Sequence, residues 1–103
     1  MAVVGWAYEL AESLLADPLP RRWAHTRGVA ARAESLAPAL GDDAEALVAA
    51  AVLHDIGYAP VVALTGFHPL DGARHLRTLP RVDERVVRLV ANRAPSRDTY
   101  LRK

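Results

Sequence analysis

A run of ten residues, 44–53, contains a single polar side chain, that of Glu45. A helix without a polar face is normally covered by protein on all sides. We therefore expect residues 44–53 to form the central helix of the fold. The run leads into His54-Asp55-Ile56-Gly57, and Gly57 is predicted to close the helix in the left-handed conformation. Two ionisable groups thus stand at the end of the most buried element.

Proline and glycine divide the rest of the chain into further helical segments, and no convincing period-two pattern of a β-strand is present. The predicted fold class is all-α, a compact bundle of five to six helices in a single domain, residues 1–103. Besides the central helix, helices are predicted at residues 4–16, 20–40 (regular to about residue 37), 58–67, 69–79 and from Asp83 onward.

Composition excludes several classes of protein. Thirteen Lys and Arg residues against twelve Asp and Glu give a net charge of +1, so nucleic-acid binding and membrane association are not expected. The absence of cysteine excludes disulfides and a thiolate nucleophile, and any metal site must use His, Asp or Glu. The apolar N-terminal segment carries Glu9 and Glu12 without a basic flank, which favours a helix over an export signal and predicts a cytoplasmic location.

Asp55 is the residue that most needs a partner. The carboxyl end of a helix is electronegative, and burying a carboxylate costs several kcal/mol unless a cation or hydrogen bonds compensate. A divalent cation beyond the helix end would be bound by His54 and Asp55 together, but adjacent helical residues diverge by about 100°, so a third ligand must come from elsewhere. The alternative is a His-Asp pair that satisfies itself by hydrogen bonding.

His25 is the natural third ligand. It is predicted to lie in one inward-facing stripe with Val29, Ala33 and Leu36. If the short connection at Gly41 makes a tight turn, helices 20–40 and 44–53 pack antiparallel, which brings the start of the first beside the end of the second.

With His25, His54-Asp55-Ile56-Gly57 and His68-Pro69-Leu70-Asp71-Gly72-Ala73, the sequence resembles the HD superfamily of metal-dependent phosphohydrolases over about residues 20–92. The resemblance implies a helical fold, hydrolysis of a phosphoester or nucleotide, and His68 as a ligand of a second metal. Three features depart from the family pattern. The further Asp that members supply from a late helix, beyond the matched region, is missing, and Asn92-Arg93 stand where dinuclear members have a His pair. Tyr58 stands where the cyclic-dinucleotide branch tends to have Lys. We therefore expect an N-terminal portion of the usual domain or a shortened member.

Under this hypothesis a divalent ion (Mn, Fe, Ni, Zn or Mg) polarises a phosphate oxygen and lowers the pKa of a bound water, which Asp55 orients. His54 and Asp55 are then the catalytic residues, and His25, His54, Asp55 and His68 the metal ligands. Arg22, near His25, is a candidate phosphate contact, as are Asn92 and Arg93 from their place in the family pattern. The expected partner is a nucleotide or another small phosphorylated molecule.

Several of these residues also have an interpretation without a functional role. His68 could be an ordinary loop residue before a helix, and Arg22 a solvated side chain. Asp71 and His75, four residues apart, are expected to form an exposed ion pair. A scaffold that binds metal or a protein without turnover is the alternative function, and pairing of two chains into a homodimer is a further hypothesis.

Overall fold

The computed structural model describes residues 2–80 and 82–91, which contain helices and no strand and so confirm the all-α class. The α-helices are α1 (Ala2–Leu15), α2 (Pro20–Leu40), α3 (Ala44–Leu53), α4 (His68–Arg77) and α5 (Glu84–Ala91). Short 3-10 helices, η1 (Gly41–Asp43) and η2 (Ile56–Tyr58), flank α3 on either side.

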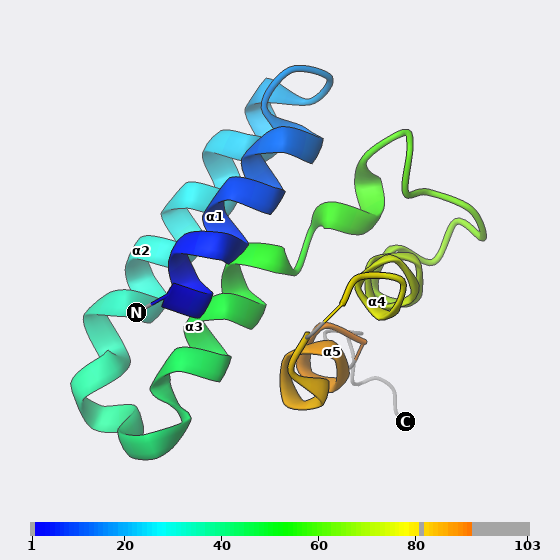
Figure 1. The fold of residues 1–103 in the computed structure, drawn as a ribbon. Helices are drawn as coiled ribbons and strands as arrows, with labels where there is room; N and C mark the ends of the chain where they lie inside the picture. The colour runs from blue at the N-terminus through cyan, green and yellow to red at the C-terminus, as the bar shows by residue number, and fades with distance from the viewer. Residues whose placement is uncertain (1, 81, 92–103) are drawn as a thin grey trace, which may run out of the picture.

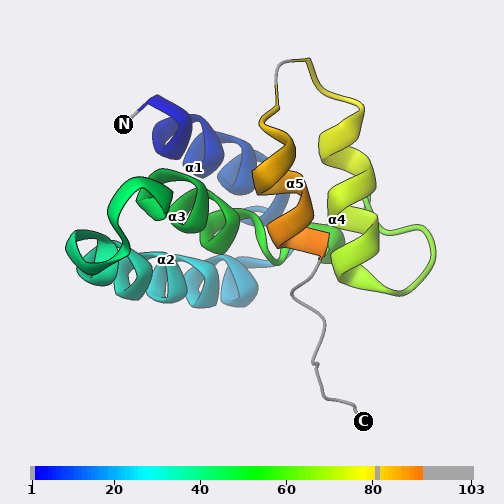
Figure 2. The same ribbon diagram turned by 90° about the horizontal axis from the view of Figure 1, so that it is seen from below.

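Helix α3 lies at the centre of this arrangement, as its composition predicts. It packs between α1 and α2, and α5 contacts it from a further side, while α4 packs on α5 and η2 (Figures 1 and 2). Its buried side chains are Ala46, Val48, Ala49, Ala50, Val52 and Leu53. The continuous apolar run is thus explained by packing on several sides at once.

The face that α2 turns toward the core differs from the predicted stripe. Its buried residues are Thr26 and Ala30, whereas His25 is exposed and Leu36 is 55% exposed. Small side chains at a spacing of four residues let α2 approach α3 closely, and this contact sets the rotation of the helix. The prediction that His25 points into the core is therefore wrong, and the residue lies at the edge of the helix pair.

Two local predictions about helix ends are also wrong. Helix α2 continues through Pro38 to Leu40, because Pro38 is exposed and the carbonyl that loses its hydrogen bond can be hydrated. Gly57 is not left-handed, because among the glycines of residues 2–80 and 82–91 a positive φ occurs at Gly41 and Gly66. Across those residues, no helix combines the length and hydrophobicity needed to cross a bilayer.

The helix predicted at residues 58–67 does not form. The chain instead leaves η2 and runs as a loop over residues 59–67 to the start of α4. The Asp71 carboxylate accepts hydrogen bonds from the backbone N–H groups of Leu64, Thr65 and Gly66. These N–H groups therefore have partners without a helix, and Gly66, at φ +89°, lets the loop turn back.

Candidate metal centre

Three side chains converge where the start of α2 meets the end of α3. These helices pack against each other and are joined by the tight turn at η1, so they run antiparallel (Figure 1). One ligand atom each from His25, His54 and Asp55 lies within 4.8 Å of the other two. The structure thus brings together the three residues that the helix-pairing argument selects, although His25 is exposed while His54 and Asp55 are buried.

A hydrogen bond at Nδ1 fixes the orientation of the His54 ring. Nδ1 is hydrogen-bonded to the backbone carbonyl of Ala51, one turn back in α3. Because a carbonyl oxygen only accepts, Nδ1 must carry the proton, and Nε2 of the neutral ring is left with a lone pair. That lone pair is 3.2 Å from Oδ2 of Asp55, which is also an acceptor. Two facing acceptors require a positive charge between them, either a proton or a metal ion.

Asp55 lies among groups that favour its ionised form. Burial raises the pKa of the carboxyl group. When a proton lies between the two side chains, the hydrogen bond and charge of His54, with the charges of Arg22 and His25, outweigh burial and hold the pKa below its usual value. Oδ2 is also 3.4 Å from the Arg22 guanidinium. An anionic carboxylate and two imidazoles form a donor set that suits a divalent ion.

The three residues open into a cavity of about 460 Å³, lined by Arg22, His25, His54, Asp55, Tyr58, Gly66, Phe67, His68 and Pro69. His68 is in this cavity at the start of α4, and its Nδ1 is 3.3 Å from the carbonyl oxygen of Gly57. It is not in the three-residue ligand cluster, so its role as a ligand of a second metal stays a prediction. Asn92 and Arg93 lie outside the described residues.

Sequence reasoning did not select Tyr58, whose ring lies between two residues that it did select. The Arg22 guanidinium carbon is 3.5 Å from the ring centroid, and the His68 ring stacks on Tyr58 with centroids 3.6 Å apart. The signals available were its departure from the family's Lys and its place directly after His54-Asp55-Ile56-Gly57, which puts Tyr58 near the ligand cluster whatever the later fold.

Asp71 is buried, not part of an exposed pair with His75, so that prediction is wrong. Its carboxylate holds the loop that leads to His68 through the three backbone N–H groups already described and the Thr65 hydroxyl, at 2.8 Å. The signal that could have found this role is its place in the first turn of α4, where an acidic side chain can reach back to unpaired N–H groups.

The Asp71 contacts predict a pH-dependent stability. The Leu64 N–H lowers the pKa most, burial opposes it, and the bonds from Thr65 and Gly66 lower it further, to about 2. A folded-state pKa below the unfolded value of roughly 3.9 contributes stability that is present above pH 4 and is lost as the pH falls toward 2. We therefore expect Asp71→Asn to lower the melting temperature at pH 7 and the difference from wild type to shrink between pH 4 and 2.

Circular dichroism melts between pH 2 and 7 would measure this difference, with Asp42→Asn, at an exposed position, as the control. A gap between wild type and Asp71→Asn that stays constant over the whole range would contradict the assignment.

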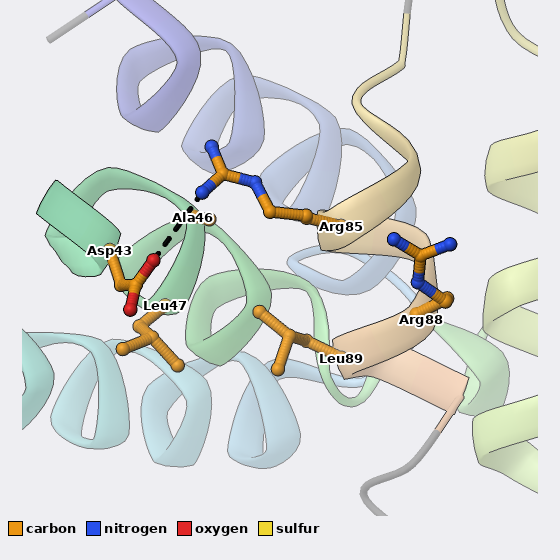
Figure 3. Close-up of a pocket in the computed structure, with 6 residues that line it drawn as sticks. All are labelled: Asp43, Ala46, Leu47, Arg85, Arg88 and Leu89. Carbon is orange, nitrogen blue, oxygen red and sulfur yellow. Dashed lines mark hydrogen bonds and ion pairs between the residues drawn. The ribbon is translucent and has the colours of Figure 1, made fainter.

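A separate cavity of about 340 Å³ lies between α5 and the start of α3 (Figure 3). Arg85 reaches across it to Asp43 at 3.4 Å, and Ala46, Leu47 and Leu89 supply apolar walls. No histidine lines it, and its one carboxylate is paired with arginine. Within the described part of the chain, the side chains that could hold a metal ion therefore lie in the His25-His54-Asp55 cavity.

The family comparison agrees with this geometry. The HD domain family model matches residues 22–101, which include the ligand cluster and the loop to His68. The chain belongs to the HD domain family. Membership places this HD domain in a superfamily of metal-dependent phosphohydrolases whose members typically bind divalent metals, and its His25, His54 and Asp55 lie within metal-binding distance. Comparisons with curated proteins and with solved structures gave no significant match.

Proposed function

We propose that this HD domain hydrolyses a phosphate ester of a nucleotide or another small metabolite, using a divalent ion held by His25, His54 and Asp55. The proposal rests on two hydrogen-bond acceptors that face each other, Nε2 of His54 and Oδ2 of Asp55, with His25 beside them. A bound divalent ion would polarise a phosphate oxygen and lower the pKa of a water molecule.

The side chains of the cavity would hold the ion and orient the water and the phosphate. His54 is held in one tautomer by Ala51, so its Nε2 stays aimed at the cluster. The ionised Asp55 would hold the ion and orient the attacking water through its carboxylate oxygens. Arg22, with a side chain 36% exposed in the cavity, would offer N–H groups to a phosphate oxygen, and His68, which also lines the cavity, would be a second substrate contact or metal ligand.

The cavity volume supports a small substrate. About 460 Å³ is within the usual range for small-molecule sites. The cavity also has charged groups of both signs close together, which suits a phosphate bound to a cation and an arginine.

Removal of metal tests this proposal. We expect the purified protein to contain a divalent ion by elemental analysis and to hydrolyse at least one member of a panel of nucleotides and small phosphoesters. Treatment with a chelator should abolish turnover, and adding Mn, Fe, Ni, Zn or Mg back one at a time should identify the ion that restores it. Bound metal without turnover across the panel would instead support the alternative, a metal-binding module that retains the scaffold.

A further inference from the structure

Tyr58 links two walls of the cavity. Arg22 comes from the first turn of α2 and His68 from the start of α4, and each lies against the Tyr58 ring. The ring planes of Tyr58 and His68 are 24° apart, which is a stacked arrangement. Tyr58 itself is only partly buried and extends from η2, directly after the cluster.

Arg22 has two partners that differ in kind. Its Nη1 is 3.4 Å from Oδ2 of Asp55, and its guanidinium carbon is 3.5 Å from the centroid of the Tyr58 ring. The first contact uses the same carboxylate oxygen that faces His54. A cation bound by Asp55 would therefore compete with Arg22 for that oxygen, whereas the contact with the ring does not depend on the carboxylate.

We propose that Tyr58 is a positioning residue: its ring holds the Arg22 guanidinium beside the ligand cluster so that the N–H groups of Arg22 can bind a phosphate oxygen when Asp55 binds the metal. The inference deepens the proposed function and rests on it. An arginine is a flexible side chain, and fixing it before the ligand arrives reduces the entropy lost on binding. Contact of a cation with an aromatic face contributes about 0.5 to 2 kcal/mol, so the ring is expected to change phosphate affinity by roughly 2- to 30-fold.

The test compares three variants. Tyr58→Phe keeps the ring and is the matched control, Tyr58→Leu removes it, and Arg22→Gln removes the cation. The dissociation constant of inorganic phosphate is measured calorimetrically on metal-loaded protein, and the Arg22 Nε–H resonance is recorded by NMR on metal-free protein. We expect Tyr58→Phe to match wild type in both, and Tyr58→Leu to weaken phosphate binding about fivefold and to lose the upfield ring-current shift of the Arg22 signal.

A double-mutant cycle separates this role from simple support of His68. If Tyr58 acts through Arg22, Tyr58→Leu adds nothing to the loss already caused by Arg22→Gln. Additive losses would overturn the proposal, as would unchanged phosphate affinity in Tyr58→Leu or no phosphate binding by metal-loaded wild type. Circular dichroism checks that each variant is folded, and loss of folding in Tyr58→Leu alone would also count against a role limited to positioning.

The proposed function can fail separately from this inference. Protein that binds phosphate with the expected coupling between Tyr58 and Arg22, but hydrolyses no phosphoester, would support the positioning role and contradict hydrolysis. Protein that hydrolyses phosphoesters with identical phosphate affinity in Tyr58→Leu and Tyr58→Phe would support hydrolysis and overturn the positioning role.

Discussion

His54→Ala is expected to abolish both metal content and phosphoester hydrolysis. The substitution removes the nitrogen that faces Asp55 at 3.2 Å and leaves His25 and Asp55 as the remaining members of the cluster. Two side chains hold a divalent ion far less tightly than three, and the ion is expected to supply several kcal/mol of transition-state stabilisation. We therefore predict that turnover falls by on the order of 10³-fold or more.

Elemental analysis and the phosphoester assay measure the two effects on the same preparations. His75→Ala is the matched control, because His75 is on α4 and is not among the residues that line the cavity. It should leave metal content and turnover unchanged. Turnover retained by His54→Ala with no bound metal would contradict the proposed mechanism.

Gly57→Ala is expected to have the largest effect on stability. A Cβ atom at this position would overlap the backbone carbonyl group of His68, and backbone cannot move aside as a flexible side chain can. The start of α4 would have to shift away from η2. Overpacking of this kind costs about 1 to 3 kcal/mol and sometimes more, so we predict a loss of roughly 3 kcal/mol in the free energy of unfolding.

Urea unfolding followed by circular dichroism measures this loss. Gly28→Ala, on the exposed side of α2, makes the same chemical change where nothing lies within 4 Å of the new methyl group. That variant should gain up to about 1 kcal/mol, since alanine is the better helix former. If the two substitutions change the free energy of unfolding equally, the close contact between His68 and position 57 is not the reason that glycine is needed there.

The central helix and the ligand cluster could be predicted because each depends on features that are local in the sequence. The run of residues 44–53 has no polar face, and a buried Asp55 at its end needs a cation or hydrogen bonds. Antiparallel pairing through the short turn at Gly41 then brings His25 to His54. Neither step needs knowledge of α4 or α5.

The predictions that were wrong depend on contacts between distant residues. The loop of residues 59–67 has no helix, and Asp71, which lies beyond the loop, accepts hydrogen bonds from its N–H groups. The place of Asp71 in the first turn of α4 points to this role only once the start of α4 is known. The rotation of α2 is set by contact of Thr26 and Ala30 with the core, so a stripe that looks apolar in sequence can lie at the edge. The Tyr58 stack likewise needs α2 and α4 to be placed first.

The loop held by Asp71 divides the cavity into two parts with different tolerance to change. His25, His54 and Asp55 come from a segment that ends before the loop begins, whereas Phe67 ends the loop and His68 and Pro69 follow it. Altering the length or sequence of residues 59–63 would reshape the wall formed by Phe67, His68 and Pro69 and leave His25, His54 and Asp55 in place. The proposed function then predicts that changes in this loop alter substrate preference while the residues proposed to hold the ion stay the same.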